Sequence, residues 1–264
     1  MENSKLKSVV QKMKAQSNLI WNREKELIKN AVENKTNEQL KILEVGSGPG
    51  VVTEKICALF PNSSVTCLEL DQELLEFHKE HASENAKKQI NIIQGNISEI
   101  DLGEEQYDLV FARLVLQHVV EVDKAIHNIN KLLKKGGKLI VTDVDEGLFG
   151  IIDPPISELE YILDQHIQEQ VIEGGDRFIG RKLWRKMKQS DFSKVTLELI
   201  PVNSDELGIQ AFIPQVDYEE METMIDNKLI NMSDIEKTRV AAEKFLKSEY
   251  PFALLVLFFV IGEK

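Results

Sequence analysis

A short apolar segment followed by three closely spaced glycines constrains the fold of this chain more than any other feature. The segment Lys41–Gly50 has the sequence KILEVGSGPG, and Val51–Phe60 continues with the pattern of a helix. Apolar residues before the glycines are typical of the end of a buried strand. Glycine lets the backbone adopt positive φ angles and approach a ligand closely, because it has no Cβ. The sequence therefore predicts a strand, a ligand-binding turn and a helix whose first N–H groups face polar ligand atoms.

The spacing of the glycines distinguishes between classes of ligand. A dinucleotide-binding turn has the pattern G-x-G-x-x-G. This turn has G-x-G-x-G instead, formed by Gly46, Gly48 and Gly50. Glu44 stands two residues before the first glycine, and its carboxylate would repel a pyrophosphate but suit an ammonium group. The spacing and Glu44 therefore favour a positively charged ligand over a dinucleotide.

Strand and helix patterns alternate over residues 41–145, as they do in a doubly wound parallel sheet. Strands are predicted at Lys41–Val45, Ser64–Leu70, Ile90–Gln94, Tyr107–Ala112 and Lys138–Asp143, with helices between them at Val51–Phe60, Gln72–Ala86 and Val122–Leu133. Two further strands are predicted at Lys194–Pro201 and Phe252–Ile261. The last of these has ten apolar or aromatic residues, which is too short to span a bilayer and fits a central buried strand.

The rest of the chain is predicted to be mainly helical. We expect N-terminal helices in residues 1–35, a core over 36–150, a helical insertion over 151–180, a core helix and strand over 181–202, a second helical insertion over 203–248, and the final strand in 249–264. Ligands of open α/β sheets bind at the carboxyl ends of the strands. The N-terminal helices and the two insertions are therefore predicted to form a lid over those ends.

Composition limits the possible partners. The 264 residues fit one large α/β domain, and a net charge of −12 disfavours non-specific binding to nucleic acid or anionic membranes. A group of basic residues between Arg177 and Lys188 is expected to be the solvated face of one helix. Cys57 and Cys67 have no metal-ligand spacing, so we expect free thiols and no metal site. The N-terminus lacks an apolar signal core, which favours the cytoplasm.

The glycine-rich turn with Glu44 resembles the cofactor loop of class I S-adenosylmethionine (SAM)-dependent methyltransferases. The resemblance covers about residues 40–200 and the last strand. It includes Leu133–Gly137 (LKKGG, with Lys135 where the family has proline), the run GGDRFIGRKLWRKMKQSDF and the closing FFVIGEK. It implies a Rossmann-like, doubly wound, seven-stranded sheet with an antiparallel last strand, SAM as cofactor and a small-molecule acceptor.

Polar side chains after the second and third predicted strands extend the resemblance. Glu69 lies 19 residues beyond Gly50, and its carboxylate can accept hydrogen bonds from both hydroxyls of a ribose, as an acidic residue does in this family. Where the family has an acidic residue that binds the adenine amino group, this chain has Asn96, whose amide oxygen can still accept that bond. The alternative for both residues is a polar turn. The resemblance implies the cofactor-binding set Glu44, Gly46, Ser47, Gly48, Gly50, Glu69, Leu70, Gly95, Asn96, Ile97 and Arg113.

Two residues are candidates for catalysis. His118 follows the fourth predicted strand and is either a general base or a packing residue at a helix start, and the packing role is favoured. Asp143, with Asp145, is expected at the end of the fifth strand, facing the substrate region, where it binds substrate or caps a turn. Asp71 is expected to cap the following helix and Asp108 to be structural.

Methyl transfer from a sulfonium depends mainly on alignment and exclusion of water. The chain has FARL at the tip of the fourth strand, not the N-P-P-Y-type tetrapeptide of many methyltransferases that act on amino groups of nucleic acids. This absence and the acidic charge favour a small-molecule acceptor. The alternatives are an RNA or protein methyltransferase, an NAD- or nucleotide-binding protein, and a non-catalytic SAM-binding regulator. A monomer or homodimer is expected.

Overall fold

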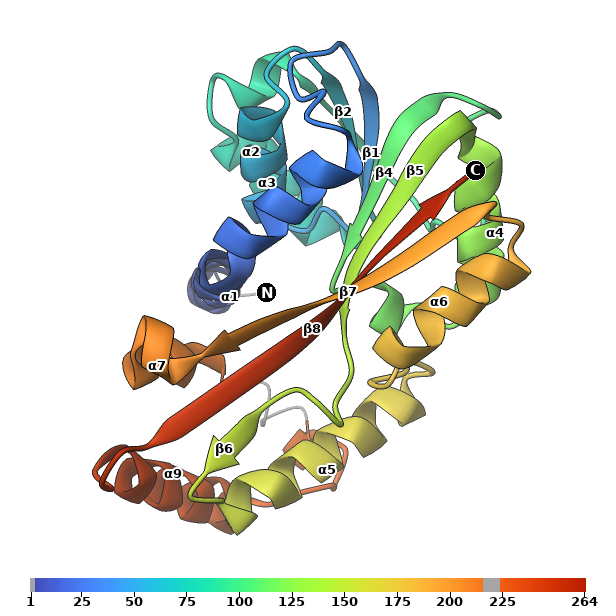
Figure 1. Ribbon diagram of the computed structural model, residues 1–264. Coiled ribbons are helices and arrows are strands. Elements are labelled where there is room, and N and C mark those ends of the chain that lie inside the picture. The colour runs from blue at the N-terminus through green and yellow to red at the C-terminus, as the bar shows by residue number, and fades with distance from the viewer. Residues whose placement is uncertain (1–2, 216–223) are drawn as a thin grey trace.

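The computed structural model describes residues 3–215 and 224–264. In this part of the chain one eight-stranded sheet forms the centre of the molecule, and helices cover both of its faces (Figure 1). The strand order is β3-β2-β1-β4-β5-β8, with β6 and β7 also paired to β8. The predicted α/β architecture is confirmed.

The parallel half of the sheet follows the predicted alternation. Its strands are β1 (Lys41–Val45), β2 (Ser64–Glu69), β3 (Ile90–Gln94), β4 (Tyr107–Arg113) and β5 (Leu133–Val144). The connecting helices are α2 (Val51–Leu59), α3 (Gln72–His81) and α4 (Val122–Leu132). Asp71 caps α3 as predicted, because its side chain accepts a hydrogen bond from the Leu74 N–H at 3.0 Å. Asp108 is structural, since it accepts from the Lys41 N–H and from Lys134 Nζ.

The last strand runs antiparallel, as predicted. Strand β8 (Phe252–Glu263) lies between β5 and β7 (Lys194–Asn203) and is antiparallel to both. The sequence did not predict the short strand β6 (Ile151–Asp153). It pairs with residues 252–254 of β8, next to residues 257–263, which pair with β5. Its three residues, directly before Pro154, are too few to produce a recognisable alternation.

The core lies on both faces of the sheet, because successive residues of a strand point to opposite sides. Leu43 and Val110 pack with α4 and α6 on one face, whereas Ile42 and Phe111 pack with α1 and α2 on the other. Burial on both faces explains why the strands have nearly continuous apolar runs. The same alternation of side chains decides which residues at the strand ends face the functional site.

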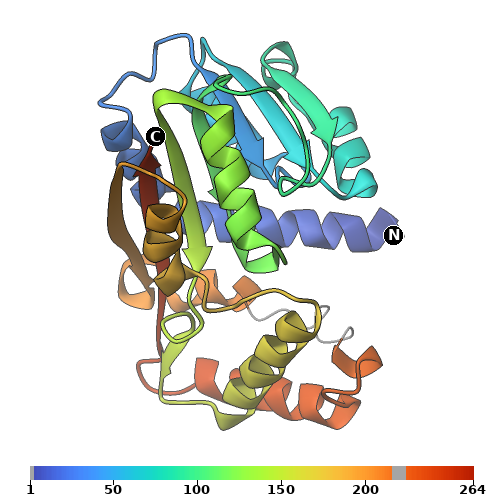
Figure 2. The same cartoon turned by 90° about the vertical axis from the view of Figure 1, so that its right-hand side faces the viewer.

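Helices outside the alternating core lie around the sheet (Figures 1 and 2). They are α1 (Asn3–Ala31), α5 (Ser157–Ile172), α6 (Gly180–Gln189), α7 (Ser204–Leu207), the 3-10 segment η3 (Ile209–Gln215) and α9 (Met232–Leu246). Of the range 1–35, where N-terminal helices are expected, residues 3–31 form the single helix α1. Helices α5 and α9 pack against each other below the sheet, and in the described ranges 3–215 and 224–264 no helix is long and apolar enough to cross a membrane.

Candidate functional site

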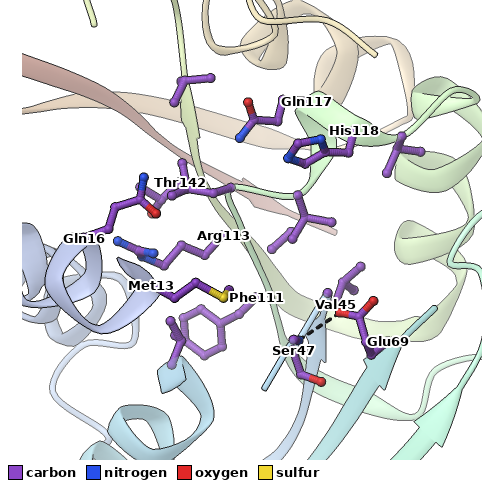
Figure 3. Close-up of a pocket in the computed structure, with 18 of the residues that line it drawn as sticks. Met13, Gln16, Val45, Ser47, Glu69, Phe111, Arg113, Gln117, His118 and Thr142 are labelled. Atoms are coloured by element: carbon purple, nitrogen blue, oxygen red, sulfur yellow. Dashed lines mark hydrogen bonds between the residues drawn. The ribbon is translucent and has the colours of Figure 1, made fainter. Parts of the chain in front are cut away.

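A cavity of about 760 Å³ opens at the carboxyl ends of the parallel strands (Figure 3). Its walls come from the glycine-rich turn, the tips of β2, β3 and β4, and the helices α1 and α5. All but two of the predicted site residues line it: Glu44, Gly46, Ser47, Gly48, Glu69, Leu70, Gly95, Asn96, Ile97, Arg113 and His118. The exceptions are Gly50 and Asp143. Residues from four strand tips that are distant in the sequence therefore meet in one space.

The glycine-rich turn has the left-handed backbone that its sequence predicts. Gly46, Gly48 and Gly50 have φ angles of 66°, 53° and 84°. A Cβ on Gly46 would lie 2.3 Å from the Val115 side chain, so this position excludes any larger residue. Gly50 is the N-cap of α2 and packs against His78 of α3, away from the cavity. Gly50 therefore has a packing role, and its contact with a cofactor stays a prediction.

Glu69 holds the turn and the end of β2 together. Its Oε2 accepts a hydrogen bond from the Gly48 N–H at 2.8 Å, and its Oε1 accepts from the Leu70 N–H at 2.7 Å. At the neighbouring tip, Asn96 Oδ1 accepts from the Ser98 N–H at 2.9 Å. Carboxylate and amide oxygens each have two acceptor positions, so both side chains retain capacity for a ligand. Their predicted contacts with ribose and adenine remain predictions.

Glu44 lies at the bottom of the cavity and is almost fully buried. Its Oε2 accepts a hydrogen bond from Thr53 Oγ1 at 2.5 Å. Burial raises the pKa of Glu44 to about 8, because the charged form loses its hydration, while the bond from Thr53 and the charge of Arg113 act in the opposite direction. An ammonium group in the cavity would stabilise the ionised carboxylate.

Two buried polar atoms of the cavity wall have no hydrogen-bond partner among the described residues. They are Ser47 Oγ and Arg113 Nη2. Arg113 also forms an ion pair with Glu24 of α1 through Nε, at 3.1 Å, so helix α1 is fixed across the cavity. Buried polar atoms without partners are costly. A polar ligand with a negatively charged group would satisfy Arg113 Nη2.

The other end of the cavity lies beside the 3-10 turn η2 (Leu116–His118). His118 Nδ1 lies 2.8 Å from Gln170 Nε2, and Gln117 Oε1 accepts a hydrogen bond from Arg177 Nη1 at 2.6 Å. The Asp176 N–H donates to the Gln117 carbonyl oxygen at 2.7 Å. The segment that ends α5 therefore binds η2 through three hydrogen bonds.

Asp143 and Asp145 do not face this space, contrary to the prediction. Both are fully buried, and neither lines the cavity. Thr142 and Val144 do line it. Because side chains alternate along β5, Asp143 between them points to the opposite face. Asp143 accepts hydrogen bonds from the Gln117 and Val144 N–H groups, and burial raises its pKa to about 6. It positions η2, whereas Asp145 forms an ion pair with Arg181.

Comparison with known proteins identifies the fold around this cavity. Residues 43–141 match the family model described as a methyltransferase domain. Malonyl-[acyl-carrier protein] O-methyltransferase of Priestia megaterium is 30% identical over 124 residues, which cover 47% of this chain and 44% of the relative. Ubiquinone biosynthesis O-methyltransferase of Rickettsia conorii is 33% identical over 107 residues, 40% of this chain and 36% of the relative. Over residues 43–141 the chain is similar to class I SAM-dependent methyltransferases.

A solved methyltransferase has the same fold over most of the chain. Phosphoethanolamine N-methyltransferase 2 of Haemonchus contortus, in complex with SAM, superposes with a TM-score of 0.57 at 17% identity, over 92% of this chain and 52% of that protein. The sequence alignments span less than half of either O-methyltransferase named above. The methyltransferase likeness in sequence is therefore concentrated in the cofactor-binding half.

SAM is the cofactor that the methyltransferase likeness implies, and the residues of the cavity fit it. The amino-acid end of SAM carries an ammonium and a carboxylate, which the buried carboxyl of Glu44 and the unpaired Nη2 of Arg113 would suit. Gly46 and Gly48 have left-handed backbone and no Cβ, so they take up little of the space beside Ser47. A Cβ on Gly48 would lie 3.2 Å from the Met13 side chain of α1.

Sequence reasoning missed residues that lie far from the strand tips along the chain but contact them in the structure. Glu24, Gln170 and Arg177 each contact a residue of the β4 tip or η2 that is 52 to 89 positions away. The run beginning GGDRF was part of the family resemblance, but its role was not apparent. A Cβ on Gly175 would lie 2.4 Å from the Gln117 carbonyl oxygen, so this glycine permits the close approach to η2.

Replacing Gly175 by alanine is expected to displace η2 from the methyltransferase site. The new Cβ would overlap the Gln117 carbonyl oxygen and Gln170 Nε2, and such overpacking costs about 1–3 kcal/mol. We expect a lower melting temperature and slower methyl transfer with unchanged SAM affinity, measured by thermal unfolding, product formation and calorimetry. The exposed neighbour Glu173, replaced by alanine, is the control. A Gly175→Ala protein with normal stability and rate would show that the approach to η2 is dispensable.

Proposed function

We propose that this chain transfers the methyl group of SAM to a small-molecule acceptor. The observation that carries the proposal is the convergence of Ser47 Oγ, Arg113 Nη2 and the protonatable Glu44 in one part of a cavity that continues beyond them. Bound SAM supplies an electrophilic methyl group on a sulfonium. The chain holds the two charged ends of its amino-acid part and excludes water with helix α1, which is tied to the site by the Glu24–Arg113 ion pair.

The part of the cavity next to α5 is suited to the acceptor. Leu159, Ile162 and Leu163 of α5 line it with apolar side chains, and Phe149 and Met224 complete the wall. Gln117 and His118 of η2 contribute polar groups to the wall of the same cavity. An acceptor with an apolar body and a polar reacting group matches this distribution. The names of the two curated relatives, which act on a malonyl group and in ubiquinone biosynthesis, support oxygen as the methylated atom.

The basic residues of α6 do not favour a nucleic-acid acceptor. Arg181 pairs with Asp145, Lys182 with Asp176 and Lys186 with Asp123. Paired cations contribute little to phosphate binding, because each contact with a phosphate would first break an existing ion pair. These ion pairs therefore favour a small-molecule acceptor. The net charge of −12 also disfavours the binding of nucleic acid.

The proposal is tested by binding and by transfer. Calorimetry should give binding of SAM and of S-adenosylhomocysteine, and none of NAD. Incubation with SAM labelled in the methyl group and a deproteinised cell extract should give S-adenosylhomocysteine and a labelled small molecule. Binding without any transfer would favour a non-catalytic SAM-binding protein, and binding of NAD alone would overturn the proposal.

A further inference from the structure

Gln117 of η2 is held in place through both its main chain and its side chain. Its N–H donates to Asp143 Oδ2 at 3.3 Å, and its carbonyl oxygen accepts from the Asp176 N–H at 2.7 Å. Its side-chain Oε1 accepts from Arg177 Nη1 at 2.6 Å. Gln117 is only 3% exposed. These three bonds therefore hold the Gln117 amide in one orientation at the cavity wall.

The buried pair of Arg177 and Glu146 fixes which end of that amide is left over. Arg177 Nε donates to Glu146 Oε2 at 2.8 Å, and Arg177 Nη2 lies 2.6 Å from the same oxygen. A guanidinium has donors and no acceptor, so the Gln117 atom that is bound to Nη1 is the oxygen. The amide nitrogen Nε2 remains, and no residue in the ranges 3–215 and 224–264 accepts a hydrogen bond from it.

The amide nitrogen of Gln117 faces the cavity. Gln117 lines this space together with Thr142 and Arg113. Figure 3 shows the nitrogen of the Gln117 amide turned towards Thr142 and the oxygen turned away from it. The cation bound to the oxygen polarises the amide and makes its N–H a better donor. A buried donor without a partner is costly, so this geometry favours a ligand atom with a lone pair beside Nε2.

The neighbours of Gln117 favour the acceptor over SAM as the partner of this donor. The ammonium and carboxylate of SAM would suit Glu44 and Arg113. Gln117 is bonded instead to Asp176 and Arg177, in the segment that follows α5. Helix α5 also supplies the apolar side chains that line the cavity where the acceptor is proposed to bind.

We propose that Gln117 Nε2 donates a hydrogen bond to an oxygen atom of the acceptor, and that Arg177 is the residue that positions it. This inference rests on the proposed methyl transfer and specifies its substrate. The oxygen belongs to a carbonyl, carboxylate or hydroxyl group, because each of these has a lone pair for an N–H donor. An ammonium group has no lone pair, so a protonated amine is not held here.

Gln117→Glu tests the donor with almost no change of shape. The carboxylate keeps an oxygen for Arg177 and replaces the N–H donor by a second oxygen, which repels a lone pair. The full chain is incubated with SAM tritiated in the methyl group and with a deproteinised cell extract, and the rate of transfer is measured against extract concentration. At low extract concentration, where the rate reports kcat/KM, we expect a fall of about 10- to 100-fold. SAM affinity, measured by calorimetry, and the melting temperature should not fall.

Gln168→Glu is the matched control, since it makes the same chemical change at an exposed position of α5 and should transfer at the original rate. A rate of Gln117→Glu equal to or above that of the control would overturn the donor role. A loss of SAM affinity as large as the loss of transfer would assign Gln117 to the cofactor and overturn the proposal. No transferred label with the original protein would instead overturn the proposed function itself.

If Arg177 acts by positioning Gln117, its effect depends on Gln117 being present. Arg177→Met combined with Glu146→Leu removes both charges of the buried pair, so neither is left without its partner. We expect this double change to lower kcat/KM for the acceptor by about 3- to 30-fold in the original protein, and by less than about twofold in a Gln117→Leu protein. The same loss in both proteins would show that Arg177 acts independently and would overturn its positioning role.

Discussion

Replacing Glu44 by glutamine is expected to stabilise the protein above pH 8 and to weaken its binding of SAM. Burial raises the pKa of Glu44 from 4.5 to about 8 in the folded protein. Between these values the folded state keeps a proton that the unfolded state has lost. The free energy of unfolding therefore falls as the pH rises from 4.5 to 8, by an amount on the order of 5 kcal/mol for this group. Glutamine removes that cost and retains an oxygen for Thr53.

Thermal unfolding at two pH values measures this effect. At pH 9 the melting temperature of Glu44→Gln should exceed that of the original protein, because the buried carboxylate is then ionised. At pH 6 the difference should be smaller, since only part of the fall between pH 4.5 and 8 has then occurred. Glu80→Gln, which changes an exposed carboxylate, is the matched control. A lower melting temperature at pH 9 would show that ionised Glu44 stabilises the fold.

The same variant should bind SAM more weakly. A buried carboxylate beside an ammonium group contributes about 1.5–3 kcal/mol, so the dissociation constant should rise about 10- to 100-fold. In the original protein the arriving ammonium should ionise Glu44, and binding at pH 7 should release close to one proton. Calorimetry in buffers of different ionisation enthalpy counts these protons. Identical proton release from Glu44→Gln would assign the proton to another group.

Replacing Glu69 by alanine is expected to reduce SAM affinity by about 1–3 kcal/mol. The carboxylate fixes the Gly48 and Leu70 N–H groups, at 2.8 and 2.7 Å, and is the predicted partner of the ribose hydroxyls. Both the shape of the turn and the ribose contact should be lost together. Calorimetric titration with SAM measures the change, and Glu80→Ala at the surface of α3 is the control. Unchanged affinity would remove Glu69 from the cofactor site.

Much of the cofactor half could be predicted from sequence because its signals are local. Gly46 and Gly48 require left-handed backbone, Asp71 caps the helix that follows it, and each of these features depends on a few neighbouring residues. Apolar runs fixed the positions of the parallel strands to within a few residues. The carboxyl ends of parallel strands meet at one edge, so Glu44, Glu69 and Asn96 could be placed in one site before any contact was known.

The prediction that Asp143 faces the cavity was wrong. The sequence placed it correctly near the end of β5 but could not determine its side, because a buried strand has apolar residues on both faces and no alternation to read. The structure turns Asp143 towards η2 and leaves Thr142 in the cavity. The packing of Gly50 against His78 could not be predicted for a related reason, because His78 belongs to another helix.

The sequence by itself determined the order of strands and helices, the glycine-rich turn and the class of cofactor, because these follow from periodicity and backbone conformation over short segments. Only the tertiary structure decided which residues form the end of the cavity beside η2 and α5. The bonds Glu24–Arg113, Gln170–His118 and Arg177–Gln117 join residues 89, 52 and 60 positions apart. Such bonds depend on how whole helices pack against the sheet, and they hold Gln117 and His118 in place at one end of the cavity.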